Sequence, residues 1–353
     1  MARIVAGNCD RNDPDELGSF FERAFREVGF TFERCRVLLK PNLLSGKAPR
    51  KAVNTHPQFI KVLAEVFLEK SCEVHIGDSP GYESTERALK GSGIMDVIQE
   101  LGLKVASFDR RLLKRSRGIS AYRDFLVGED PADFDIIVNL PKLKTHAMMG
   151  LTLGVKNTFG FVPRFEKAKW HLRAGSDARL FAAILIDIYN IVKPSITILD
   201  GILGMDGDGP SSGRPRELGI VAVSQDALAL DAFVEGSLRL GSPLPLTGLA
   251  LEKGLIEKAD VVDLGMPVVR DFTMPKTMDV GWNLPSVVRN VMKRVFVKKP
   301  SCVHELCRKC GICAEVCPTH ALTSDEEFPT FDYKACIRCY CCQEMCPEGA
   351  IRV

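Results

Sequence analysis

The sequence predicts an α/β fold: a largely parallel sheet with helices on both faces, followed by a small C-terminal α+β domain. Three observations predict this fold. Apolar segments alternate with amphipathic ones through residues 1–270, which is typical of strands buried between two layers of helices. Polar residues directly follow several of the apolar segments. Ten of the 13 cysteines lie after residue 300, which sets that part of the chain apart.

The strands and helices follow one another in a regular order. The predicted strands are RCRVLLKPN, CEVHIGDSPG, KVASFD, DFDIIVNLP, ITILDGILGMDG with its loop, and LGIVAVSQ. The predicted helices are HPQFIKVLAEVFLEKS, ERALKGSGIMDVIQELG, ARLFAAILIDIYNIVKPS and DALALDAFVEGSLRLG. Because most strands are followed by a helix, we expect neighbouring strands to run parallel.

Polar side chains gather where four of these strands end. In open parallel sheets the carboxyl edge is where ligands bind, so we expect the polar groups to line a crevice there. Lys156 and Asn157, which stand in a glycine-flanked segment, and His171 are added to the same site. The residues at the strand ends are Lys40, Asn42, Asp78, Asn139, Lys142, Lys144, His146, Asp200, Asp206 and Asp208.

These residues predict a site for an anion, because lysine side chains bind carboxylates and phosphates. A solvated loop, a turn or a helix cap remains an alternative for each of them, and a metal site is a further alternative for the aspartates. We assign a catalytic role to Lys142, Lys144, His146, Lys156 and His171, with the histidines supplying protons. We assign substrate binding to Lys40, Asn42, Asp78, Asn157, Asp200, Asp206 and Asp208.

Several function classes lack their usual signals. The chain has no phosphate-binding loop, no dinucleotide fingerprint and no nucleophile elbow. A net charge of +2 without a basic stripe argues against nucleic-acid binding. The N-terminus does not resemble a signal peptide, and no uninterrupted apolar run is long enough to cross a membrane. We therefore expect a cytoplasmic protein without a transmembrane segment.

The late cysteines form an internal repeat. CRKCGICAEVCP begins at Cys307 and CIRCYCCQEMCP at Cys336, an offset of 29 residues, and each copy reads C-x2-C-x2-C-x3-C-P. This spacing is that of two-cluster bacterial ferredoxins, in which the fourth cysteine of each run binds the other cluster. We expect two [4Fe-4S] clusters. Cluster 1 takes Cys307, Cys310, Cys313 and Cys346, and cluster 2 takes Cys336, Cys339, Cys342 and Cys317.

The other cysteines fall outside this pattern. Zinc knuckles or a disulfide knot remain alternatives for the repeat, although zinc sites usually use two separated C-x2-C pairs. Cys341 is expected to line the second cluster without binding it, and Cys302 to be a free thiol. Cys9, Cys35 and Cys72 are expected to be free thiols as well.

Two resemblances extend this interpretation. Residues 301–353 resemble a 2[4Fe-4S] ferredoxin domain, which implies one-electron transfer. The motifs LLKPNLL, GDSPG, NLPKLKTHAMMGLTLGVKNTFG, KWH and DGILGMDGDGPSSG resemble the DUF362 family, a domain family of unknown function often fused to a ferredoxin. That resemblance implies an α/β domain whose polar motifs lie near one another, and it names no reaction.

We therefore predict a DUF362-like domain over residues 1–270, a linker over 271–300 and a ferredoxin domain over 301–353. The linker contains PSVVRNVMKRVFV, an amphipathic segment expected to form a helix that packs on one domain. Residues 301–353 carry five Lys and Arg against eight Asp and Glu, a net charge of −3, so the remainder is +5. Opposite charges favour docking between the two parts or with a partner.

Three functions fit these observations. The first is an iron–sulfur oxidoreductase that acts on an anionic small molecule in the crevice. The second is an electron carrier or adaptor whose large domain docks a partner enzyme. The third is a redox-responsive regulatory or maturation protein, which the complete set of cluster ligands disfavours. A redox partner protein is expected for each.

Overall fold

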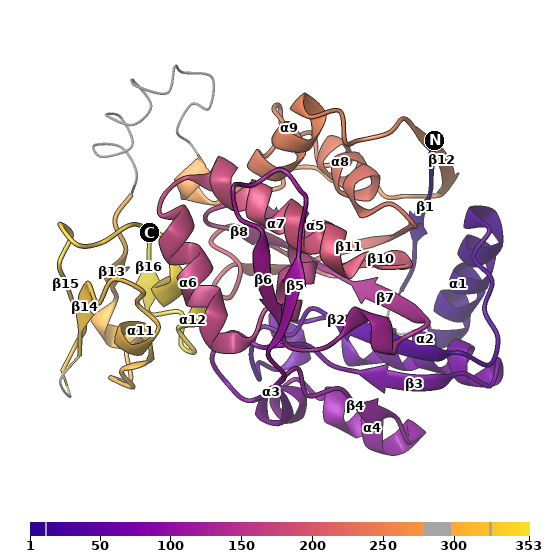
Figure 1. Cartoon of the computed structure of the whole chain (residues 1–353), viewed down its shortest axis with the longest axis horizontal. Coiled ribbons are helices and arrows are strands. Elements are labelled where there is room, and N and C mark those ends of the chain that lie inside the picture. The colour runs from indigo at the N-terminus through magenta and orange to yellow at the C-terminus, as the bar shows by residue number, and fades with distance from the viewer. Residues whose placement is uncertain (11–12, 279–297, 325–326) are drawn as a thin grey trace.

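The computed structural model describes residues 1–10, 13–278, 298–324 and 327–353. A central sheet lies between two layers of helices, and the C-terminal segment packs as a small unit beside helix α6 (Figure 1). The amphipathic segment predicted within the linker, residues 285–297, lies outside the described residues.

The main sheet has the strand order β12-β1-β11-β10-β7-β2-β3-β4. Five of the neighbouring pairs are parallel, and only the two pairs that β11 makes, with β1 and β10, are antiparallel. This confirms the predicted largely parallel α/β fold. The strands are β1 (Ala2–Asn8), β2 (Arg36–Pro41), β3 (Glu73–Ile76), β4 (Lys104–Val105), β7 (Ile136–Leu140), β10 (Ile196–Asp206), β11 (Arg214–Ser224) and β12 (Ala259–Leu264).

Helices cover both faces because alternate strand residues point to opposite sides. Val37 and Leu39 of β2 belong to the apolar cluster under one helix layer, whereas Leu38 belongs to the cluster under the other. The first layer contains α1 (Pro14–Val28), α2 (Pro57–Glu69), α3 (Thr85–Gly91) and α4 (Ile94–Leu101). The second contains α5 (Gly154–Asn157), α6 (Arg164–Ala174), α7 (Ala178–Val192), α8 (Ala227–Ser237) and α9 (Pro245–Glu252).

The lysine-rich segment after β7 is a strand and not the loop that we considered from the sequence. Strand β8 (Lys142–His146) is buried along its length and pairs with β10 on one side and with β9 (Gly150–Thr152) on the other. Its lysines therefore lie inside the protein. A separate hairpin consists of β5 (Leu112–Arg115) and β6 (Asp124–Val127), and short 3-10 turns span Pro49–Lys51, Pro131–Asp133, Thr158–Phe161, Lys276–Met278 and His304–Leu306.

The C-terminal segment is a small α+β unit with its own apolar centre, to which Ala321, Leu322, Ala350 and Ile351 contribute. Two short strand pairs, β13 with β16 and β14 with β15, frame two short helices. The elements are β13 (Ser301–Cys302), α11 (Ile312–Glu315), β14 (Leu322–Thr323), β15 (Thr330–Phe331), α12 (Cys341–Met345) and β16 (Ile351–Arg352).

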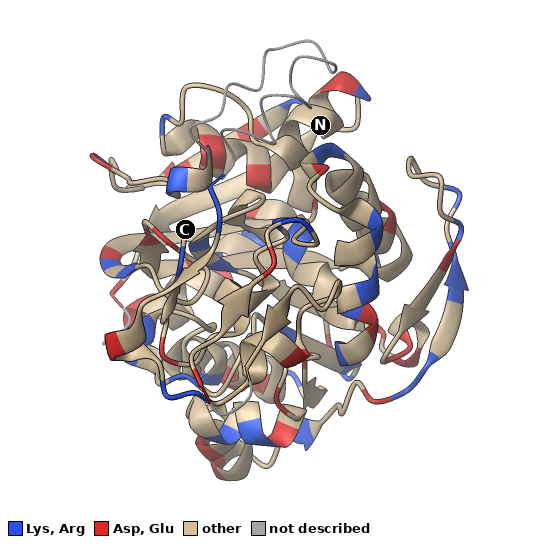
Figure 2. Ribbon diagram, turned by 90° about the vertical axis from the view of Figure 1, so that its left-hand side faces the viewer, with Lys and Arg blue, Asp and Glu red and all other residues tan. Residues whose placement is uncertain are grey.

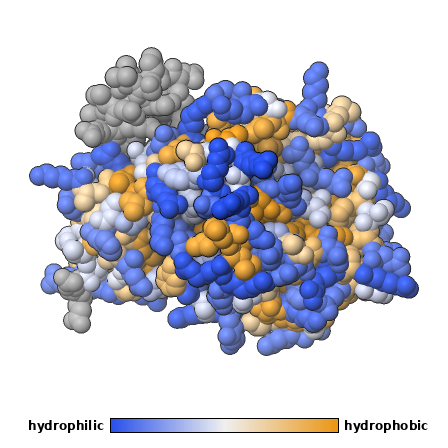
Figure 3. All heavy atoms as spheres, in the orientation of Figure 1, coloured by the Kyte–Doolittle hydropathy of each residue, from blue (hydrophilic) through white to orange (hydrophobic). Residues whose placement is uncertain are grey.

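The surface carries charges of both signs. Lys and Arg are interspersed with Asp and Glu over the ribbon (Figure 2), and several apolar patches lie among hydrophilic side chains on the face seen in Figure 3. Within the described ranges, no helix has the length and apolar character needed to cross a membrane.

Candidate functional site

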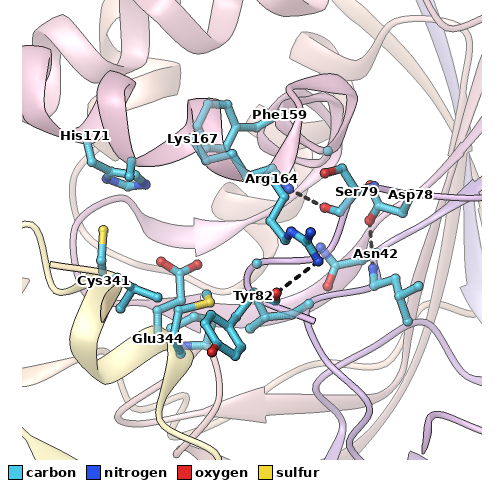
Figure 4. A pocket seen from close by; sticks show the side chains of 18 of the residues that line it. Asn42, Asp78, Ser79, Tyr82, Phe159, Arg164, Lys167, His171, Cys341 and Glu344 are labelled. Carbon is cyan, nitrogen blue, oxygen red and sulfur yellow. Dashed lines mark hydrogen bonds between the residues drawn. The ribbon is translucent and has the colours of Figure 1, made fainter. Parts of the chain in front are cut away.

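A cavity lies where the C-terminal segment packs against the carboxyl edge of the sheet (Figure 4). Its volume is about 160 Å³, many times the space that one water molecule needs. The larger part of its wall comes from the loops after β2 and β3, from β8 and β9, and from α5 and α6. The C-terminal segment closes it with Glu315, Val316, Cys341, Glu344 and Met345.

The two parts of the chain are held together by specific contacts around this cavity. The Tyr82 hydroxyl donates a hydrogen bond to Glu315 Oε2 at 2.6 Å, and the Ser211 hydroxyl donates to the Glu344 carbonyl oxygen. Gly81 lies against Met345, and a Cβ atom at Gly81 would overlap the methionine side chain. The glycine thus allows the close approach of α12.

Two of the predicted lysines are neutralised by carboxylates. Lys40 Nζ lies 2.9 Å from Asp78 Oδ1, and Lys142 Nζ lies 2.6 Å from Asp200 Oδ2. Neither Lys40 nor Lys142 is on the cavity wall, although Asp78 is. These pairs satisfy buried charges and leave little net charge for a ligand.

The cations that do line the cavity have no carboxylate within ion-pair distance among the described residues. Lys144 Nζ donates to the Val53 carbonyl oxygen, Lys167 to the carbonyl oxygens of Ser79 and Pro80, and Arg164 to that of Tyr82. Lys156 Nζ has no hydrogen-bond partner within the described part of the chain. The cavity therefore offers several cations without a direct carboxylate contact, although the negative charge of Glu344 on the same wall acts on Lys156, Lys144 and Lys167.

Burial sets the protonation of these lysines. Burial, assisted by the positive charge of Lys156, lowers the pKa of Lys144 to about 7. Burial likewise lowers the pKa of Lys167 to about 8 and moves that of Lys156 below its ordinary value. An anion in the cavity would favour the charged forms and oppose this effect.

His146 lies behind the cavity wall and faces the C-terminal segment. Its Nδ1 accepts hydrogen bonds from the backbone N–H groups of Met148 and Met149 at 3.1 and 3.2 Å, so the ring proton is on Nε2. That nitrogen lies 3.4 Å from Glu344 Oε1, beyond hydrogen-bond geometry. Burial lowers the pKa of His146 to about 4. Burial disfavours the charged form of Glu344, but His146 and Lys156 outweigh it and hold its pKa below its usual range.

His171 is on the cavity wall. Its ring packs against Phe181 with the ring centres 4.6 Å apart, and its Nδ1 has no hydrogen-bond partner among the described residues. Burial lowers the pKa of His171 to about 4, so the imidazole is neutral near pH 7. A neutral imidazole presents one donor and one acceptor.

Three asparagine amides connect the sheet to the cavity. Asn139 donates to the Gly154 carbonyl oxygen, Asn157 donates to Asn139 Oδ1, and Asn42 donates to Asn157 Oδ1, at 2.9, 2.8 and 3.0 Å. Asn42 and Asn157 lie on the cavity wall.

The predicted acidic residues do not come together at one site. Asp206 pairs with Arg214 and Arg216 at 2.9 Å each, and Asp200 pairs with Lys142. Neither they nor Asp208 line the cavity. The structure thus gives Asp206 and Asp200 cation partners from the protein itself.

Of the predicted site residues, Asn42, Asp78, Lys144, Lys156, Asn157 and His171 meet at the cavity. The sequence interpretation missed Arg164 and Lys167, which lie on the same helix as His171. Spacings of three and four residues place such side chains on one helix face, so that signal was present. It also missed Tyr82, Glu315 and Glu344, whose positions depend on how the C-terminal segment docks.

The late cysteines form two groups. Cys307, Cys310, Cys313 and Cys346 line one small cavity of the C-terminal segment. Burial, then the nearby Cys346, raises the pKa of Cys313 to about 11. Burial and then Cys339, Cys336, Cys317 and Cys313 raise the pKa of Cys342.

Each copy of the cysteine repeat also has an equivalent backbone hydrogen bond to the sulfur of its fourth cysteine. The Ala321 N–H donates to Cys317 Sγ at 3.3 Å, and the Ala350 N–H donates to Cys346 Sγ at 3.2 Å. Such donors stabilise thiolate ligands and tune iron–sulfur potentials. The donor set of eight grouped cysteine sulfurs therefore fits two clusters.

Comparisons with known proteins agree with this architecture. Residues 37–234 match the family described as Domain of unknown function (DUF362), and residues 306–350 match the 4Fe-4S dicluster domain. The match confirms both resemblances and marks the chain as an iron–sulfur protein of the electron-transfer type.

Two individual proteins are similar to the chain. The Thylakoid-associated protein sll1697 of Synechocystis sp. is 34% identical over 276 residues, which cover 75% of this chain and 85% of that protein. The structure of the lactate racemase apoprotein from Thermoanaerobacterium thermosaccharolyticum has a TM-score of 0.43 and 11% identity, covering 69% of this chain and 58% of that one.

Proposed function

This chain belongs to the DUF362 family, and we propose from that premise that it is an iron–sulfur oxidoreductase acting on a small anionic molecule bound in the shared cavity. One observation carries the proposal. Helix α12 of the ferredoxin segment, which contributes Cys341, Glu344 and Met345, forms a wall of the cavity that the lysines line. Cys342 and Cys346, two of the expected cluster ligands, lie on or beside that helix.

Two [4Fe-4S] clusters are the proposed cofactors. Cluster 1 would be held by Cys307, Cys310, Cys313 and Cys346, and cluster 2 by Cys317, Cys336, Cys339 and Cys342. The grouping of the sulfurs and the paired amide donors support these sets. When bound, such clusters supply one-electron transfer.

The residues of the cavity take separate roles in this proposal. Lys156, Lys144 and Lys167 bind the anionic group, since no carboxylate among the described residues lies within ion-pair distance of them. His171 donates or accepts a proton at the substrate, because its imidazole is neutral and lines the cavity. His146 does not line the cavity and instead positions Glu344. Apolar side chains such as Phe159 and Leu43 cover the rest of the substrate.

The experiment that tests this function uses the cluster-loaded full chain under anaerobic conditions. Thermal unfolding is followed against phosphorylated and carboxylated metabolites for wild type and Lys156→Ala. A ligand at ~100 times its Kd should stabilise wild type by about 2.7 kcal/mol. Lys169→Ala is the matched control, because Lys169 is exposed and pairs with Glu166 outside the cavity.

A ligand that passes this test should also reoxidise the dithionite-reduced protein in wild type and not in Lys156→Ala. Binding without reoxidation would reject the oxidoreductase and retain the anion site. If no anion binds, the function of an electron carrier that docks a partner enzyme becomes the preferred one. The exposure of Cys310 favours access for a redox partner protein in either case.

A further inference from the structure

Two cysteines lie together at the amino ends of β2 and β3. Cys35 Sγ and Cys72 Sγ are 3.3 Å apart, although 37 positions separate the two residues in the chain. They directly precede Arg36 and Glu73, which are register partners on these two parallel strands. The pairing of the strands therefore holds the two thiols side by side.

The backbone around the pair suits a disulfide. The Glu73 N–H donates to the Cys35 carbonyl oxygen at 2.9 Å, and the Arg34 N–H donates to the Lys70 carbonyl oxygen at 3.0 Å. Adjacent strands are about 4.8 Å apart, and disulfides join Cα atoms that are about 4.4–6.8 Å apart. Because an S–S bond is about 2.05 Å long, the two sulfurs need to approach each other by only about 1 Å to form one.

The two thiols differ in their access to solvent. Cys72 is 5% exposed and belongs to the apolar cluster that packs under α1 and α2. Cys35 is partly exposed, and it lines an open surface depression together with Phe32, Glu33 and Asp135. A small reagent in solution would therefore reach Cys35 first and would react with Cys72 only through Cys35.

We propose that Cys35 and Cys72 are a modification site, at which a small-molecule disulfide such as oxidised glutathione converts the two thiols into an intrachain disulfide. Cys35 Sγ attacks as a thiolate on one sulfur of the reagent and forms a mixed disulfide, which releases the first small thiol. Cys72 Sγ then attacks Cys35 Sγ and releases the second small thiol. The two protein thiols give up two electrons and two protons, and the reagent disulfide takes them up to become two thiols.

The surroundings of the pair determine the rate and the consequence of this reaction. Burial, and then the contact with Cys72, raises the pKa of the Cys35 thiol, so little thiolate is present near pH 7 and the exchange should become faster as the pH rises. The new bond would close a loop that contains α2, and such a crosslink stabilises the folded chain by restricting the unfolded one.

This inference does not depend on the proposed function. Cys35 and Cys72 stand at the amino ends of β2 and β3, whereas the cavity is lined by the loops that follow the carboxyl ends of the same strands. The disulfide would thus act on the stability of the large domain and not on the lysines of the cavity.

The test incubates the cluster-loaded full chain with oxidised glutathione under anaerobic conditions at about pH 8. The remaining thiols are then alkylated in denaturant, and peptide mass spectrometry identifies the linkage. We expect a Cys35–Cys72 linked peptide that a reductant separates, a Tm above that of the reduced protein and an unchanged iron content. Cys9→Ser, which removes another buried thiol, is the control and should give the same result.

Two variants test the order of the steps. Cys72→Ser should stop at the mixed disulfide, with glutathione bound to Cys35. Cys35→Ser should form neither the linkage nor a glutathione adduct at Cys72, and its Tm should not respond to the reagent.

The inference is overturned if wild type keeps both thiols free at every oxidised glutathione concentration that leaves the clusters intact. It is also overturned if Cys72 in Cys35→Ser takes up glutathione as fast as wild type forms the linkage, because Cys72 would then be accessible on its own. Neither result affects the anion site, which the metabolite panel tests separately.

Discussion

Lys142 Nζ and Asp200 Oδ2 lie 2.6 Å apart, with both side chains 1% exposed, and the two residues are register partners on the adjacent strands β8 and β10. Asp200 also accepts a hydrogen bond from the His56 backbone N–H at 2.8 Å. The pair thus links β8, β10 and the start of α2, and we interpret its role as structural.

Lys142→Ala should therefore destabilise the fold. Removal of one partner leaves the Asp200 carboxylate buried without its cation, which in general lowers the free energy of unfolding by about 3–5 kcal/mol. Urea denaturation of the full chain measures the loss. A loss below about 1 kcal/mol would contradict the structural role, and so would abolished anion binding in a variant of unchanged stability.

Lys144 should give the protein a characteristic pH dependence. Its pKa is about 7 in the folded chain, against an ordinary value of 10.5. Between these values the unfolded chain holds a proton that the folded chain lacks, so this lysine makes the free energy of unfolding rise with pH across that window. At pH values below about 7 the folded chain carries the buried charge of Lys144, and the unfavourable free energy of burying that charge lowers its stability in full.

Lys144→Met measures that contribution. The variant should be more stable than wild type near pH 6, and the difference should shrink as the pH rises from about 7 towards 10.5. Urea denaturation at several pH values provides the comparison. Parallel curves for the two proteins would show that Lys144 keeps an ordinary pKa. Anion affinity of wild type should also fall as Lys144 loses its proton.

The crossed ligand sets predict which cysteine variants resemble one another. Cys317→Ser should lose the same cluster as Cys336→Ser and keep the one lost in Cys313→Ser, each retaining about four of about eight iron atoms per chain. Iron and sulfide analysis with electron paramagnetic resonance distinguishes the two clusters. Cys302→Ser is the control with full iron content. A spectrum of Cys317→Ser that matches Cys313→Ser would refute the crossing.

Gly160 should not tolerate a side chain. A Cβ atom there would overlap Asp78 and Lys40, the buried ion pair beneath the cavity. We expect Gly160→Ala to lower the free energy of unfolding by about 1–3 kcal/mol. Gly236→Ala on α8 is the control, because a Cβ there meets nothing within 4 Å, and it should be neutral or stabilising. Equal stability of both variants would show that the pair moves freely.

The sequence was enough to predict the fold class and the ferredoxin-type domain, because both rest on local patterns. It was not enough to predict which lysines are paired with a carboxylate in the fold. Lys142 and Lys144 are two residues apart on one strand face, yet β10 supplies a carboxylate to the first, whereas the second donates to the Val53 carbonyl oxygen. Which lysine is neutralised depends on strand register, which involves residues far apart in the chain.

The strand at KLKTH could have been predicted from its sequence pattern. KLKTH alternates polar and apolar residues over its first residues, a pattern that indicates a strand, although we considered a loop there. Glu344 is different, since nothing in its neighbourhood indicates that it faces His146. Only the docking of the ferredoxin segment brings those two side chains together.

The cavity has walls from two parts of one chain, and this arrangement has a thermodynamic consequence. A ligand that touches both walls must strengthen their association by the same factor by which that association strengthens ligand binding. Because both parts belong to one polypeptide, the association is unimolecular and does not depend on protein concentration. A bound substrate would therefore stabilise the contact between the ferredoxin segment and the large domain, and its release would weaken that contact.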